Sequence, residues 1–125
     1  MYTIRFANSK IEEYLRNTET KIENNKANKR EILLYKKIAK TLYLISENPK
    51  HPGLNSHEID ELSRKYNIKI FESYIENRKS AAMRIFWVYG PNNNEITIFG
   101  LEQHPNNKNN SYKNINFSNI FNRNK

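Results

Sequence analysis

The sequence predicts a small α+β domain with two N-terminal helices packed on a mainly antiparallel sheet of four strands. Three observations carry this prediction: an alternating segment at the start of the chain, two amphipathic segments after it, and a later region rich in β-branched and aromatic residues. The chain has 125 residues, enough for one domain with a modest core. We expect that domain to span residues 1–117, followed by a basic, frayed tail over residues 118–125.

The N-terminal segment has the pattern of a strand followed by a helix. Apolar residues alternate with polar ones over residues 2–6, which is the period of a strand with one buried face. Ser9 and Glu12 then have the spacing of a capping box, in which the hydroxyl accepts from an amide of the first turn and the carboxylate reaches back. The first helix should therefore begin at Ser9, with one narrow apolar stripe.

A second, more apolar helix is predicted over residues 31–47. An asparagine-rich break at 24–28 separates it from the first helix, and Pro49 follows its end. The two helices should pack antiparallel on the sheet. The apolar pattern of residues 58–66 is too weak to predict more than a short helical turn.

A β-hairpin is the strongest β signal in the chain. Residues 83–89 are almost all apolar, β-branched or aromatic, residues 90–94 are turn formers, and residues 96–101 resume the apolar pattern. Residues 67–76 return to strand-like composition before the hairpin. These segments and the N-terminal strand make up the predicted sheet.

Arg84 is the unexpected residue of the hairpin. A strand with apolar residues on both faces is usually central in its sheet, where a guanidinium needs a partner or an open surface. Arg84 either serves a function or pairs across the sheet with Glu72 or Glu102, and the sequence leaves both interpretations open.

Composition limits the classes of function. The chain has no cysteine, so disulfides and thiolate metal sites are excluded, and its three histidines lack the spacing of a metal site. The N-terminus does not resemble a secretory signal and no stretch has the length of a membrane span, so we expect a cytoplasmic protein with no membrane partner. A net charge of +8 favours a polyanionic partner, although the abundance of Asn, Lys and Ile is also what an AT-rich genome produces.

Three stretches resemble the RelE/ParE superfamily of bacterial toxins. Leu44–Pro49 with Pro52–Leu54 is similar to the segment that closes the family's second helix. Met83–Trp87 resembles the hallmark Tyr-Arg-aliphatic-aliphatic-Tyr strand, and Ile96–His104 resembles the next strand, which ends at a basic residue or histidine. The resemblance covers most of residues 2–112.

The resemblance implies the toxin component of a toxin–antitoxin system, bound by a cognate antitoxin protein. RelE-like members are ribosome-dependent endoribonucleases that cut mRNA in the ribosomal A site without a metal or other cofactor. ParE-like members inhibit DNA gyrase. The alternative to a nuclease is thus a non-catalytic binder, either a gyrase inhibitor or a degenerate relative that only binds an antitoxin.

The resemblance also implies site residues. Arg84 matches the strand arginine that contacts the scissile phosphate, His104 occupies the position of the terminal basic residue or histidine, and Tyr112 or Lys113 falls near the family's C-terminal tyrosine. The predicted RNA-binding residues are Lys69, Lys108 and Lys113. The strand around Lys69 departs from the family, because it carries Glu72 where RelE-like nucleases often have several basic residues.

These residue types suit RNA cleavage. His104 can transfer protons near neutral pH, Arg84 can neutralise charge on the phosphorane, and Tyr112 can orient the substrate or stack on a base. Each residue also has a purely structural interpretation. His104 can be a surface histidine at a strand end, Arg84 can form an ion pair across the sheet, and Tyr112 can anchor the tail by packing. We expect His51 and His57 to be exposed loop residues that could join an acid–base cluster, and the lysines of the second helix to form its solvated face: Lys36, Lys37 and Lys40.

Overall fold

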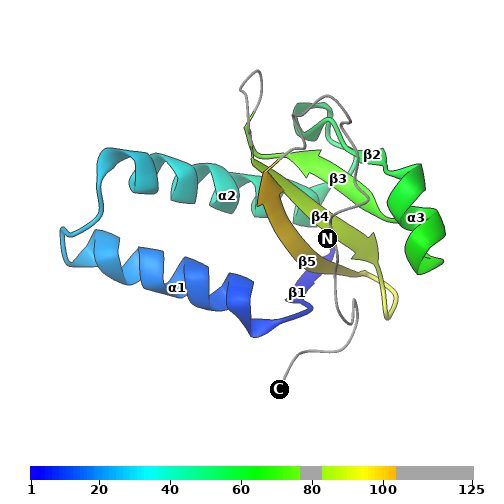
Figure 1. Cartoon of the computed structure of the whole chain (residues 1–125), viewed down its shortest axis with the longest axis horizontal. Helices are drawn as coiled ribbons and strands as arrows, with labels where there is room; N and C mark the ends of the chain where they lie inside the picture. The colour runs from blue at the N-terminus through cyan, green and yellow to red at the C-terminus, as the bar shows by residue number, and fades with distance from the viewer. Residues whose placement is uncertain (77–82, 104–125) are drawn as a thin grey trace.

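The computed structural model describes residues 1–76 and 83–103, the last of these for its backbone alone. The helical elements are α1 (Ser9–Glu23), α2 (Lys29–Glu47), the 3-10 turn η1 (Pro52–Leu54) and α3 (Asp60–Tyr66). The strands are β1 (Thr3–Phe6), β2 (His57–Glu58), β3 (Phe71–Tyr74), β4 (Met83–Tyr89) and β5 (Glu95–Gln103). They form one sheet in the order β1-β5-β4-β3-β2 (Figure 1).

The α+β class is confirmed, but the details differ from the prediction. The sheet has five strands instead of four and is mixed, because β1 pairs in parallel with β5 while the other pairs are antiparallel. The added strand β2 has only two residues, too few to show any periodicity. Helix α3 is a third helix, where only a turn was predicted. Its apolar pattern is weak because Leu62 is its one buried residue.

The predicted helix start is right, but the predicted cap is wrong. Asn8, not Ser9, is the N-cap of α1, and its side chain accepts from the Lys10 amide at 3.0 Å. A capping box occurs instead at α2, where the Asn28 side chain accepts from the Glu31 amide at 2.8 Å and the Glu31 carboxylate accepts from the Asn28 amide at 3.0 Å.

The sheet buries apolar side chains on both of its faces. Successive residues of a strand point to opposite faces, so Trp87 packs in the layer under α1 and α2 while Phe86 packs under α3. A register shift between these two residues leaves Phe99 of β5 without an opposite residue, and Phe99 joins Phe86 in the second layer. The helical pair α1–α2 extends well beyond the sheet at one end (Figure 1).

Candidate functional site

Arg84 lies on the central strand β4, opposite Tyr74 of β3 and Glu102 of β5. Its side chain is only 5% exposed. Nη1 donates to the backbone carbonyls of Glu76 at 2.7 Å and Met83 at 3.2 Å. The guanidinium carbon stacks 3.8 Å from the centre of the Tyr74 ring, in cation–π contact. Its Nε is buried and makes no hydrogen bond within the described residues.

Neither of the two carboxylates predicted as alternative partners forms an ion pair with Arg84 in the part of the chain that the structure describes. Glu102 is opposite Arg84 in the register, yet its side chain is exposed. Partial desolvation raises the pKa of the Glu102 carboxyl above its ordinary value. Glu72 is fully buried and lies against a different partner, His57.

Four polar and aromatic residues from three strands form what we call the β2–β4 cluster: His57, Glu72, Tyr74 and Arg84. The register places His57 opposite Glu72 and Tyr74 opposite Arg84, and Glu72 and Tyr74 share one face of β3. The His57 ring meets the Tyr74 ring edge-on, with 5.9 Å between their centres. An imidazole, a carboxylate, a phenol and a guanidinium thus occupy adjacent positions on the face that packs under α3.

The two nitrogens of His57 both face oxygen atoms. Nδ1 lies 2.8 Å from the carbonyl oxygen of Asn55, and Nε2 lies 3.1 Å from Oε1 of Glu72. A carbonyl can only accept, so Nδ1 carries a proton. Glu72 Oε1 is buried and makes no hydrogen bond within the described residues, so its contact with Nε2 has the distance of an ion pair without hydrogen-bond geometry. The His57 side chain is 44% exposed to solvent.

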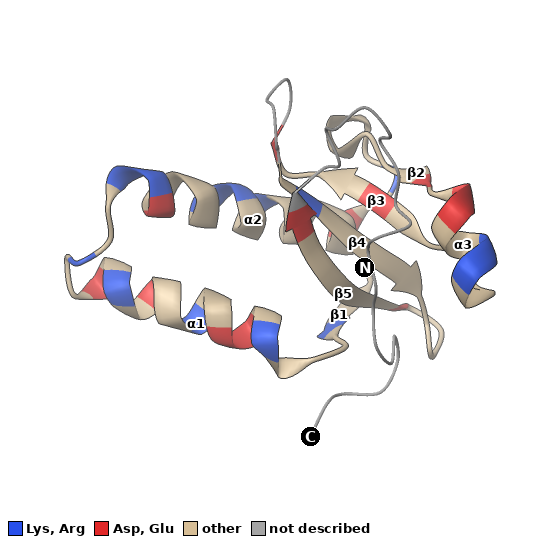
Figure 2. Ribbon diagram, in the orientation of Figure 1, with Lys and Arg blue, Asp and Glu red and all other residues tan. Residues whose placement is uncertain are grey.

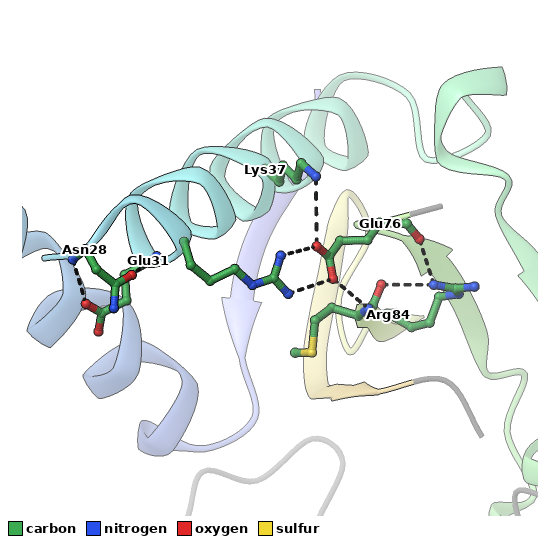
Figure 3. A network of polar contacts seen from close by, with 7 residues as sticks. Asn28, Glu31, Lys37, Glu76 and Arg84 are labelled. Atoms are coloured by element: carbon green, nitrogen blue, oxygen red, sulfur yellow. Dashed lines mark hydrogen bonds and ion pairs between the residues drawn. The ribbon is translucent and has the colours of Figure 1, made fainter. Parts of the chain in front are cut away.

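Glu76 connects the cluster to helix α2 (Figure 3). Its side chain is 1% exposed, and its carboxylate receives Nη1 of Arg30 at 2.9 Å and the backbone amide of Met83 at 3.2 Å, with Nζ of Lys37 at 3.9 Å. Its backbone carbonyl is the acceptor of Arg84. Two cations of α2, Arg30 and Lys37, thus compensate the buried charge of Glu76. The backbone of the same residue holds the Arg84 guanidinium in place.

An open groove of about 370 Å³ lies where α1 begins and where β5 continues past the end of β1. Apolar atoms line most of it. Its residues come from the first turns of α1 and from the facing ends of β4 and β5: Asn8, Lys10, Ile11, Tyr14, Met83, Phe99, Gly100, Leu101 and Glu102.

Of the six predicted site residues, the structure describes Arg84 and Lys69. Lys69 is exposed just before β3 and lines a shallow hollow beside α3 with Arg64 and Asp60, so it does not belong to the cluster. The other four lie outside the described residues, as do the predicted domain end and tail: His104, Tyr112, Lys108, Lys113 and residues 118–125.

The expectation for the two loop histidines is only partly right. His57 is exposed, but it lies in strand β2 and pairs with Glu72. His51 is partly buried and caps η1 by accepting from the Gly53 amide at 2.9 Å. Sequence reasoning missed Tyr74 and Glu76. The alternation of Glu72 and Tyr74 along one strand was the available signal for Tyr74.

Within residues 1–76 and 83–103 no three metal-ligating side chains come together, and no helix is long and apolar enough to cross a membrane. The chain matches no protein-family model, no curated protein and no solved structure.

Proposed function

We propose that the chain is the RelE-like toxin of a toxin–antitoxin system, a cytoplasmic endoribonuclease that cuts mRNA on the ribosome and is held inactive by a cognate antitoxin. The observation that carries this proposal is the β2–β4 cluster. It brings a phosphate-binding group, an aromatic ring and an acid–base pair to one face of the sheet, at the arginine that the sequence resemblance singles out.

The proposed reaction is an internal transfer at phosphorus. The 2′-hydroxyl of the RNA loses a proton, and its oxygen attacks the adjacent phosphorus. The bond from phosphorus to the 5′-oxygen breaks and that oxygen gains a proton, which leaves a 2′,3′-cyclic phosphate and a 5′-hydroxyl. Catalysis needs one group to accept a proton, one to donate a proton, and a cation beside the phosphorane.

The cluster offers a group for each of these needs. Arg84 supplies the cation. The His57–Glu72 pair supplies a proton-transfer group, with the imidazole edge open to solvent. His104 remains the proposed second acid or base, and in the sequence it follows Gln103, the last residue of β5, which lies opposite Met83. Tyr112, Lys108 and Lys113 remain proposed substrate contacts.

The burial of Arg84 favours a second candidate, a binder without catalytic activity. A guanidinium that is 5% exposed and donates to two backbone carbonyls can act as an internal strut of the sheet. On this alternative the surface of the domain inhibits gyrase or binds only an antitoxin, and the cluster serves stability.

Primer extension on translated mRNAs after brief induction separates the two candidates. The wild type should produce cuts inside coding regions, and Arg84→Ala should abolish them. Arg5→Ala is the matched control, because Arg5 is also a strand arginine with a cross-strand hydrogen bond, 2.9 Å to Thr97, but lies on β1 away from the cluster. Emptying the ribosomes should remove the cuts. Growth arrest without cuts would overturn the nuclease and support the binder.

A further inference from the structure

One side of α2 carries exposed basic and apolar residues that take no part in the core. Steps of four and three residues place them in one line along the helix, on the side opposite the buried Ile38 and Ile45. Leu33 is 48% exposed and Tyr43 is 59% exposed, the largest fraction of any large apolar side chain after Met1 among the described residues. We call this line the α2 stripe: Lys29, Leu33, Lys36, Lys40 and Tyr43.

The three lysines of the stripe form a surplus of positive charge. No carboxylate in the described part of the chain pairs with any of them. Their neighbours Arg30 and Lys37, which face the sheet, are by contrast held by Glu76. Lys36 and Lys40 lie one helical turn apart, a spacing at which like charges destabilise a helix. Figure 2 shows this repetition of basic positions along α2, whereas acidic and basic positions are mixed along α1.

We propose that the α2 stripe binds the phosphate backbone of structured RNA. Lys29 and Lys40 are separated by about 16 Å along the helix axis at 1.5 Å per residue, a length that spans several phosphates of an RNA strand. Three uncompensated ammonium groups can each replace a counterion at a phosphate. The exposed Tyr43 ring can stack on a base, and its hydroxyl is held by Glu47 at 2.7 Å, which orients the ring.

Two other anionic partners fit the stripe less well. A helix that lies on a membrane surface needs a continuous apolar face, and the stripe has only Leu33 and Tyr43. An acidic protein segment would be recognised by the lysines but would leave the exposed aromatic ring without a planar partner. RNA satisfies both the charges and the ring.

The inference rests on the proposed function for its choice of RNA as the partner, and it adds a second contact surface to the cluster. The stripe and the cluster are connected through Glu76. Its carboxylate pairs with Arg30 and Lys37, which lie on the side of α2 next to the stripe. Its carbonyl oxygen accepts a hydrogen bond from Arg84. RNA bound along α2 would be presented at the end of the sheet where β4 begins.

The test is fluorescence anisotropy of the full chain with a labelled RNA hairpin, titrated at salt concentrations from about 50 to 200 mM. The Lys36→Gln/Lys40→Gln variant should weaken binding roughly tenfold and reduce the slope of log K against log salt by about two, one for each lost phosphate contact. The matched control is Arg16→Gln/Lys50→Gln, which removes the same charge from exposed basic residues off the stripe and should change the slope far less. Thermal melts should show that both variants stay folded.

Further arms separate the outcomes. Tyr43→Ala should weaken binding to the hairpin without changing the salt slope, because it removes stacking on an unpaired loop base and no charge. Equal slopes for the stripe and control variants would overturn the inference, as would stripe-dependent binding to anionic phosphatidylserine vesicles in place of the hairpin. The measurement is independent of cleavage: a wild type that binds through the stripe but cuts nothing would refute the nuclease and leave the RNA surface standing.

Discussion

Arg84 and Glu76 are joined through the backbone: Nη1 of Arg84 donates to the carbonyl oxygen of Glu76 at 2.7 Å, while the carboxylate of the same Glu76 accepts from Arg30 on α2. The candidate functional residue Arg84 is therefore positioned by Glu76, the residue that also binds helix α2. A substitution of Arg30 or Lys37 on α2 can therefore affect the position of the Arg84 guanidinium through Glu76 alone.

We expect Arg30→Gln to destabilise the fold more than Glu76→Gln. Removal of the cation leaves a carboxylate that is 1% exposed, with the Met83 amide at 3.2 Å and the more distant ammonium of Lys37 at 3.9 Å, whereas removal of the carboxylate leaves a cation that is 56% exposed and can be hydrated. The loss for Arg30→Gln should be about 1–3 kcal/mol in the free energy of unfolding. Urea denaturation of both single variants and the double variant measures the coupling. A double variant no more stable than Arg30→Gln would contradict this account.

Tyr74→Leu should lower the free energy of unfolding by about 0.5–2 kcal/mol through loss of the stacking contact with Arg84. Tyr74→Phe keeps the ring and should retain most of that stability. The informative measurement is a double-mutant cycle between Tyr74→Leu and Arg84→Ala, followed by denaturant unfolding. If the two losses simply add, the ring and the guanidinium are not coupled.

Glu31 should make the stability of the fold depend on pH in the acid range. The hydrogen bond from the Asn28 amide, and then that from Lys21, hold the pKa of the Glu31 carboxyl below its ordinary value. The folded state therefore favours the ionised form, and this contribution is present above the unfolded pKa of about 4.3 and lost as pH falls through the lower folded pKa. Glu31→Gln should melt below the wild type at neutral pH, and the two melting curves should converge in acid. A constant gap at every pH would contradict the prediction.

Local patterns were enough to predict the two long helices and the hairpin, since each is encoded by neighbouring residues. Helix α2 and strands β4 and β5 lie within two residues of the predicted positions at nearly every end. The cap of α1 was misplaced because Asn8 and Ser9 are both good caps in adjacent positions, and only the backbone geometry decides between them.

The candidate site was only partly predictable, because its contacts depend on long-range register. Arg84 was conspicuous as a charge on an apolar strand. The pairing of His57 with Glu72 follows from the two-residue ladder between β2 and β3, and the ion pair of Glu76 with Arg30 follows from the packing of α2, neither of which leaves a periodic signal. The alternative interpretation, a pairing of Arg84 with Glu72 or Glu102, is not found, because backbone carbonyls and the Tyr74 ring contact the guanidinium instead.

The most direct test of the proposed nuclease is the chemistry of the RNA ends that it leaves. Purified ribosomes translating a defined mRNA are incubated with the wild type or with Arg84→Ala, and the 3′ and 5′ ends of the fragments are identified by mass spectrometry. Attack by the 2′-hydroxyl predicts a 2′,3′-cyclic phosphate and a 5′-hydroxyl from the wild type, and intact mRNA from Arg84→Ala. Fragments with 3′-hydroxyl and 5′-phosphate ends, or equal cutting by the two proteins, would contradict the assignment of the cluster.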